Sequence, residues 1–203
     1  MIDLVSVNVG QARPIAAKSG QTGIFKTPQD GPVMIAPEGV EGDTIVDRKH
    51  HGGPAQAVYA YSVPDLHWWM EELGAEVPPG AFGENLTLDG IASGDFALGD
   101  RLIIGDVVLR VTSPRIPCAT LEARFGLPGF AARFRMARRP GPYFRVDAPG
   151  QIRAGQTVAF QPFDGLRMPI ARFTEPHWPE RLNDEEKAVL PETGAHPGIL
   201  AEI

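Results

Sequence analysis

The chain has 203 residues, of which 43% are hydrophobic and 22% are charged, a composition typical of one globular domain with or without a short appendage. Its 23 glycines and 20 prolines argue against a mostly helical fold, because glycine costs backbone entropy and proline lacks the N–H that a helix needs. The net charge of -6 repels phosphate backbones, so we expect no nucleic-acid partner. The sequence shows no basic leader and no apolar run of about 20 residues, so we also expect no membrane contact and a cytoplasmic location.

The first half of the chain has the pattern of short strands with one helix. Alternating apolar residues and short apolar runs predict strands over residues 2–9, 22–26, 33–36 and 55–61. Pro64 suits the first turn of a helix, and Gly74 is expected to end that helix.

The second half of the chain begins with a hairpin and returns to strands after two helices. The hairpin joins strands over 101–104 and 107–111 through a turn at Gly105 and Asp106. Helices are predicted over 118–126 and 128–138, with apolar side chains available for burial at Phe125, Leu127, Phe130 and Phe134. Strands are then expected over 142–146 and 156–161. This order predicts a mainly β fold with some α structure, an irregular β-barrel with short flanking helices.

Residues 164–203 differ in character from the domain that we place at residues 1–163. They contain five prolines, and their one clear helix signal is a capping box formed by Asn183 and Glu186. We expect a C-terminal appendage with one short helix, either folded against the domain or partly disordered.

The single cysteine, Cys118, cannot form an intramolecular disulfide and is either a small buried hydrophobe or a reactive thiol. Pro114 and Pro117 make the preceding segment extended chain outside a central strand, just before a predicted helix. The Arg115 cation and the N-terminus of that helix both favour thiolate over thiol. The segment therefore indicates a nucleophile or a soft-metal ligand.

Two other segments concentrate polar side chains. Residues 47–54 combine adjacent histidines with paired glycines, which suit an anion-binding loop or an ordinary solvated turn. A zinc site that joins Cys118 to one of these histidines lacks further ligands at a recognisable spacing. Residues 80–88 include Asn85, whose amide could contact the edge of a heterocycle, although such a residue is also common in turns. Four arginines within residues 133–139 could bind a small anion. The sequence contains no Walker A, Rossmann or α/β-hydrolase motif, which argues against those classes of enzyme.

The order and spacing of these segments resemble the MOSC domain family, named after the C-terminal domain of molybdenum cofactor sulfurase. Within it, the chain is most similar to the small bacterial 6-N-hydroxylaminopurine reductases. The resemblance covers roughly residues 1–163 and rests on motifs at residues 22–26, 39–43, 50–53, 57–61, 83–86, 99–101, 113–118 and 124–126. It implies a MOSC β-barrel that binds the pterin form of the molybdenum cofactor, and the family as a whole is also associated with pyridoxal phosphate binding.

The resemblance also assigns roles to single residues. Cys118 matches the family's cysteine ligand to molybdenum, and a thiolate is a soft donor that suits this metal. Arg115 is expected to contact the pterin phosphate or to polarise the oxo group of the metal. The other expected cofactor contacts are Asn85, His51, Gly52, Gly53, Lys26, Lys49, Thr112, Ser113 and Thr120.

By this resemblance the protein is an oxidoreductase that reduces N-hydroxylated small molecules to amines, as a detoxification. A separate reductase would supply the electrons, since the chain has no flavin or nicotinamide motif, and the protein could form a homodimer. The alternative is a carrier of the cofactor, or of persulfide sulfur on Cys118, without turnover of its own. A third interpretation makes Cys118 a core residue of a binding domain. The sequence departs from the branch at Gln56, where a basic residue is common, and at Pro142, where an aromatic residue is common.

Overall fold

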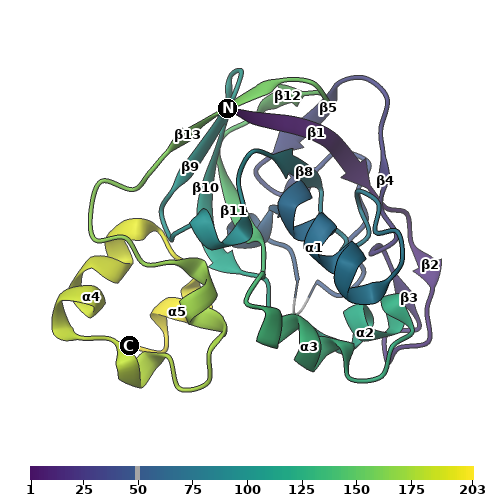
Figure 1. Cartoon of the computed structure of the whole chain (residues 1–203). Helices are drawn as coiled ribbons and strands as arrows, with labels where there is room; N and C mark the ends of the chain where they lie inside the picture. The colour runs from purple at the N-terminus through teal and green to yellow at the C-terminus, as the bar shows by residue number, and fades with distance from the viewer. Residues whose placement is uncertain (49–50) are drawn as a thin grey trace.

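Seven strands form a closed barrel in this computed structural model, which describes residues 1–48 and 51–203 (Figure 1). They are β1 (Ile2–Val9), β7 (Val58–Ser62), β8 (Leu86–Asp89), β9 (Arg101–Ile104), β10 (Val107–Pro114), β11 (Pro142–Ala148) and β13 (Thr157–Gln161). Neighbours follow the order β13-β9-β10-β11-β7-β8-β1, and the pairing of β1 with β13 closes the ring. The strands β7 and β8 are parallel, whereas the other neighbours around the ring are antiparallel.

Shorter strands and helices lie around the seven barrel strands. The strand β4 (Thr27–Pro28) pairs with the end of β1, β2 (Arg13–Pro14) pairs with β3 (Gln21–Thr22), and β5 (Val33–Ala36) lies between β6 (Gly39–Val40) and β12 (Gly150–Ile152). The helices α1 (Val63–Leu73), α2 (Ala119–Phe125) and α3 (Phe130–Ala137) lie on one side of the barrel (Figure 1). Short 3-10 turns span Pro54–Gln56 and Ser93–Asp95.

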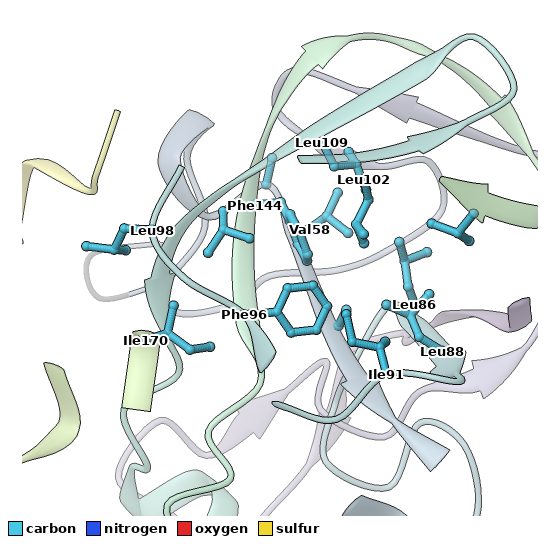
Figure 2. Close-up of a cluster of buried hydrophobic side chains, with 14 of the residues drawn as sticks. Val58, Leu86, Leu88, Ile91, Phe96, Leu98, Leu102, Leu109, Phe144 and Ile170 are labelled. Carbon is cyan, nitrogen blue, oxygen red and sulfur yellow. The ribbon is translucent and has the colours of Figure 1, made fainter. Parts of the chain in front are cut away.

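The barrel interior is apolar. Leu4, Leu88, Leu102, Leu109 and Phe144 are completely buried and belong to one cluster of side chains (Figure 2). Each such side chain stabilises the fold by roughly 1.5–3 kcal/mol relative to an exposed one. The barrel is therefore a filled core, and a ligand has to bind outside it.

A second apolar cluster lies between the three helices and one wall of the barrel. Its centre is Trp69, whose ring stacks on Phe134 with centroids 5.9 Å apart and whose Nε1 donates a hydrogen bond of 2.7 Å to the Tyr61 hydroxyl. Phe82 and Phe130 complete the aromatic contacts around Trp69. This cluster holds the loops before and after the helices in fixed positions.

The C-terminal segment is folded against the barrel. It contains α4 (Asp184–Val189) and α5 (Pro197–Leu200) with 3-10 turns at Ile170–Thr174, Pro179–Arg181 and Leu190–Thr193, and it lies beside the lower end of the barrel in Figure 1. Met168, Ile170 and Leu190 are buried in the same cluster as the barrel side chains. The backbone N–H of His196 also donates to the carbonyl of Thr112 at the end of β10.

The predicted fold class is confirmed, and most expected elements form close to their predicted bounds. The helix that begins near Pro64 ends at Gly74, which has a left-handed φ of 62°, and Asn183 and Glu186 form the predicted capping box. No helix among the described residues is both long and apolar enough to cross a membrane.

Three local predictions are wrong. Pro114 does not lie outside a central strand, because β10 continues to Pro114, which pairs with Pro142 of β11. Residues 23–26 form a loop rather than a strand, because the backbone of Gly23 lies so close to Thr44 that a Cβ there would sit 1.8 Å from the Thr44 carbonyl oxygen. Leu127 is 41% exposed instead of buried, since it lies in the link between α2 and α3.

Candidate functional site

A pocket opens where loops from distant parts of the chain meet beside the barrel. Its walls come from Thr22, Gly23, Ile24, Lys26, Thr44, Ile45, Val46, His51, Gly52, Tyr59, Gly83, Asn85, Arg115, Cys118 and Tyr143. The pocket has a cavity volume of about 100 Å³ and is open to solvent. Enclosed small-molecule sites are commonly about 300–1,000 Å³, so a ligand of that size would extend from this pocket into its open side.

Cys118 lies in the pocket wall as the residue before helix α2. Its backbone is extended, with φ -127° and ψ 170°, and its side chain is half-buried. Burial opposes ionisation of the thiol, but a hydrogen bond from His51, the Arg115 cation and the backbone N–H of Leu121 outweigh it. These contacts lower the pKa of Cys118 from 9.0 to about 6, so the side chain is a thiolate at neutral pH.

Arg115 is a buried cation beneath the same wall. Its Nη1 donates to the carbonyl oxygen of Phe82, and its guanidinium lies 5.0 Å from the ring centroid of Tyr59. Its Nε is buried and makes no hydrogen bond to the described protein, although a buried N–H normally has a partner. The pKa of Arg115 stays above its usual value despite burial, because of the neighbouring Tyr59, Tyr143 and Cys118. Arg115 therefore brings a permanent charge and one unused donor to the pocket.

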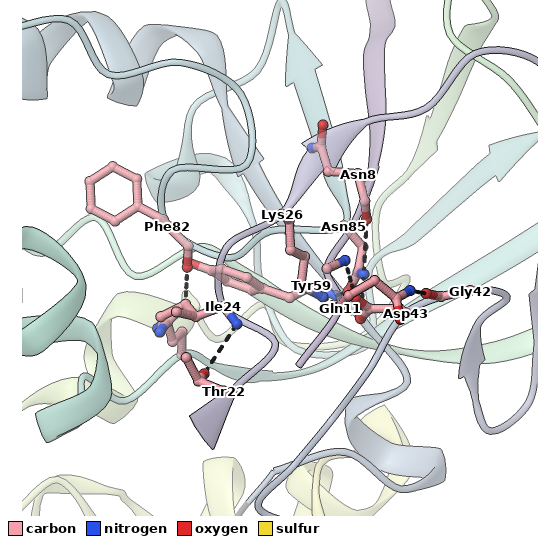
Figure 3. Close-up of polar contacts among 12 residues, drawn as sticks. Asn8, Gln11, Thr22, Ile24, Lys26, Gly42, Asp43, Tyr59, Phe82 and Asn85 are labelled. Atoms are coloured by element: carbon pink, nitrogen blue, oxygen red, sulfur yellow. Dashed lines mark hydrogen bonds and ion pairs between the residues drawn. The ribbon is translucent and has the colours of Figure 1, made fainter. Parts of the chain in front are cut away.

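Asp43 contacts two residues of the pocket walls, Lys26 and Asn85 (Figure 3). Its carboxylate accepts hydrogen bonds from the backbone N–H of Gly10 at 2.8 Å and from the Asn85 side-chain amide at 2.9 Å, and it forms an ion pair with Lys26. Burial lowers the pKa of Lys26, and the Asp43 carboxylate opposes that shift. One carboxylate thus joins the end of β1, the loop of residues 23–26 and the loop before β8.

Both the oxygen and the nitrogen of the Asn85 side-chain amide form hydrogen bonds. The oxygen accepts from the backbone N–H of Tyr59 at 3.2 Å, and the nitrogen donates to the Asn8 carbonyl as well as to Asp43. Its side chain still lines the pocket. In this structure Asn85 fixes the relative position of β7, β1 and the Asp43 carboxylate.

Glu84 is completely buried next to this wall. Its two oxygens accept hydrogen bonds from the backbone N–H groups of Gly80 and Phe82, at 2.6 and 3.1 Å, and from the Thr87 hydroxyl at 3.2 Å. Burial raises the pKa of Glu84 to about 7, against the effect of these donors. The carboxyl group therefore holds the residue 80–83 turn, which supplies the Phe82 carbonyl to Arg115.

Six of the predicted site residues meet in the pocket, namely Lys26, His51, Gly52, Asn85, Arg115 and Cys118. Gly52 has a left-handed φ of 80°, and a Cβ there would lie 2.8 Å from Cδ1 of Ile45, another wall residue. A glycine is therefore required for this packing of the wall.

Four other predicted contacts lie outside the pocket walls: Gly53, Thr112, Ser113 and Thr120. The Thr112 hydroxyl donates to the carbonyls of Ala55 and Tyr143, at 2.6 and 3.2 Å, and so supports the two segments that carry pocket residues. Ser113 lines a separate cavity between the barrel and the C-terminal segment. Lys49 lies outside the described residues, and its role stays a prediction.

Sequence reasoning assigned no role to Asp43, Tyr59 or Tyr143, which the structure adds to the site. Asp43 is the last residue of the motif at residues 39–43, but the sequence did not show that its side chain contacts Lys26 and Asn85. Three arginines of the predicted anion cluster form ion pairs within the protein: Arg133 with Glu72, Arg138 with Glu175 and Arg139 with Asp65.

Among the described residues, no three His, Cys, Asp or Glu side chains gather into a group that could hold a metal ion. A metal at Cys118 would therefore take its other ligands from a cofactor. The pocket has features that suit such a group: one thiolate, a buried cation with an unused N–H, and open space beside both.

The MOSC domain family matches residues 47–159 of the chain. The uncharacterized protein YflK of Bacillus subtilis (strain 168) is 34% identical over 157 residues, which cover 76% of this chain and 71% of YflK. A protein named Reductase from Gibberella moniliformis is 34% identical over 166 residues, 77% of this chain but 28% of that protein. The crystal structure of YiiM from Geobacillus stearothermophilus superposes with a TM-score of 0.75 at 29% identity, over 97% of this chain and 92% of YiiM.

Proposed function

Because the chain belongs to the MOSC domain family, in its YiiM-like branch, we propose that it is a molybdenum-cofactor-dependent reductase of N-hydroxylated compounds. Its substrates would be small molecules such as hydroxylaminopurines, which it converts to amines. The observation that carries the proposal is the position of Cys118, a half-buried thiolate between His51 and Arg115 in the wall of an open pocket. Cys118 packs against the second apolar cluster but is only partly buried, whereas a core cysteine would be fully enclosed by apolar side chains.

The residues of the pocket fit the pterin form of the cofactor. Cys118 would be the protein ligand of molybdenum, since a thiolate is a soft donor and the pterin dithiolene brings further sulfur ligands. The unused Nε–H of Arg115 and the left-handed backbone at Gly52 would contact the anionic parts of the group. When bound, the cofactor supplies a two-electron redox centre.

The remaining pocket residues would hold that centre in place. His51 donates to the Cys118 thiolate and so fixes its orientation, as partners of metal ligands commonly do. The Lys26 ammonium is neutralised by Asp43, which leaves Arg115 as the cation better suited to an anionic ligand. Asn85 keeps its part of the pocket wall rigid through its three hydrogen bonds.

A separate reductase would supply the electrons, because the sequence shows no flavin or nicotinamide motif. The fungal relative is named Reductase, and the region that matches this chain is 28% of that longer protein. The protein would thus bind the substrate and the cofactor and receive its electrons from another polypeptide.

The test is reduction of 6-N-hydroxylaminopurine by the holoenzyme from a host that makes the cofactor, with a chemical electron donor and product analysis by chromatography. We expect adenine to form with the wild-type protein and not with Cys118→Ser. The matched control is Ser93→Ala, a buried serine whose hydroxyl makes no hydrogen bond in the described structure and which lies outside the pocket walls.

A molybdenum-loaded wild-type protein that forms no adenine would contradict the reductase proposal. A stable extra sulfur atom on Cys118 in the mass spectrum of such an inactive protein would instead support the carrier of persulfide sulfur.

A further inference from the structure

Three tyrosines occur in the chain, and the structure brings all of them together. The ring of Tyr59 lies 6.3 Å from Tyr61 and 5.0 Å from Tyr143, measured between centroids. The Tyr59 hydroxyl donates to the carbonyl of Pro140 at 2.9 Å, and the Tyr61 hydroxyl donates to the carbonyl of Arg139 at 2.9 Å. The Tyr143 hydroxyl makes no hydrogen bond to any described residue, so it is the tyrosine of the three with a free donor.

Tyr143 also has the right location for contact with a substrate. It lines the same pocket as Cys118, and its side chain is half-buried rather than enclosed. It lies in β11 and pairs with Tyr59 of β7 on one side and with Ser113 of β10 on the other. Two neighbouring strands therefore hold its backbone, and a donor on such a rigid element needs little reorganisation during a reaction.

We infer that Tyr143 is a catalytic residue of the proposed reductase, whose hydroxyl donates a hydrogen bond to the substrate oxygen that leaves as water. The inference rests on the proposed function. The reaction takes up two electrons and two protons, breaks the N–O bond of the N-hydroxylated compound and gives the amine and water. The electrons come from the separate reductase, and the protons come from solvent at the open side of the pocket.

The phenol keeps its own proton during this reaction. Burial raises the pKa of Tyr143, although the Arg115 cation opposes the shift, so the hydroxyl remains a donor at neutral pH. As negative charge develops on the departing oxygen, a fixed donor stabilises that oxygen more than it stabilises the bound substrate. Loss of one such donor in other enzymes commonly reduces kcat by about 100- to 1,000-fold.

The test compares Tyr143→Phe with Tyr61→Phe as holoenzymes. Each variant loses one phenol oxygen, but Tyr61 lies outside the pocket walls, where its hydroxyl is tied to Arg139 and Trp69. Molybdenum content, kcat and KM for 6-N-hydroxylaminopurine are measured for both variants at a temperature where both are folded by circular dichroism. We expect Tyr143→Phe to lose at least about 10-fold in kcat with little change in KM and unchanged molybdenum content, and Tyr61→Phe to stay within about twofold of wild type.

Three results would overturn the inference. If Tyr143→Phe keeps the kcat of the wild type, Tyr143 donates nothing to the departing oxygen. If kcat falls only in proportion to molybdenum content, Tyr143 supports cofactor binding instead. If the molybdenum-loaded wild-type protein reduces no N-hydroxylated compound, both the proposed function and this inference are wrong. That result differs from the first two, in which the wild-type protein is active.

Discussion

The reactivity of Cys118 depends on neighbours that are far from it in sequence. Arg115 was visible three residues before the cysteine, but His51 is 67 positions away and reaches the thiol only in the folded chain. Both neighbours favour the thiolate, which lowers the pKa of Cys118 to about 6. The sequence therefore showed one neighbour that favours the thiolate, Arg115, but could not show His51, whose hydrogen bond lowers the pKa most.

Replacement of His51 tests this arrangement in the protein without cofactor. In His51→Ala the thiolate loses a hydrogen bond, so we expect the pH midpoint of Cys118 alkylation to rise from about 6 toward the ordinary value for cysteine. The measurement is the rate of iodoacetamide modification against pH, followed by mass spectrometry of a chain with a single cysteine. His67→Ala, at an exposed position of α1, is the control. A wild-type midpoint above pH 8 would contradict the described contacts.

Glu84 gives the stability of the protein a pH dependence of its own. Its pKa is about 7 in the folded protein, above the usual value of 4.5, so between these two values the folded state holds a proton that the unfolded state has released. The contribution of Glu84 to the free energy of unfolding is largest below pH 4.5. It decreases as pH rises to about 7, by up to about 1.4 kcal/mol per pH unit. We expect the free energy of unfolding by urea to fall more steeply over this range in wild type than in Glu84→Gln. Equal slopes in the two proteins would contradict the assignment.

At the scale of elements, the predictions that succeeded were those decided by local patterns. Alternation in β1, the hairpin of β9 and β10, and the glycine after α1 each depend on residues within one short segment. The loop of residues 23–26 has an apolar pattern that suits a strand, but its backbone is shaped by the close contact of Gly23 with Thr44, 21 positions later. The walls of the site come from such loops, which explains why its membership was harder to predict than the barrel.

The C-terminal elements show the same limit. Their prolines and short apolar runs left open whether the segment is folded, but Leu190 is completely buried with barrel side chains. We expect Leu190→Ala to lower the free energy of unfolding by about 2–5 kcal/mol and to weaken amide-exchange protection in β10 as well as in the C-terminal segment. Leu166→Ala, at a position 37% exposed, is the control and should cost clearly less. Protection of β10 that stays unchanged in Leu190→Ala would show that the segment unfolds independently.

For the whole molecule, the barrel core and the pocket have separate tasks. The barrel is filled by its own side chains, so the candidate pocket is built outside it, from loops that include Gly23, Gly52 and Gly83. The net charge of -6 would not attract the anionic cofactor that we propose, so the local field of the buried Arg115 would have to do so. The fold and the position of the thiolate could be expected from the sequence, whereas the pairing of Lys26 with Asp43 and the free hydroxyl of Tyr143 could not.

The central claim is that Cys118 binds molybdenum, and metal analysis of the purified protein tests it most directly. Wild type, Cys118→Ser and Ser93→Ala are produced in one cofactor-competent host, checked for folding by circular dichroism and measured by inductively coupled plasma mass spectrometry. We expect about one molybdenum atom per chain in wild type and Ser93→Ala, and none in Cys118→Ser, because an alcohol oxygen is a poor substitute for a soft thiolate. Molybdenum retained at the wild-type level in folded Cys118→Ser would contradict the claim.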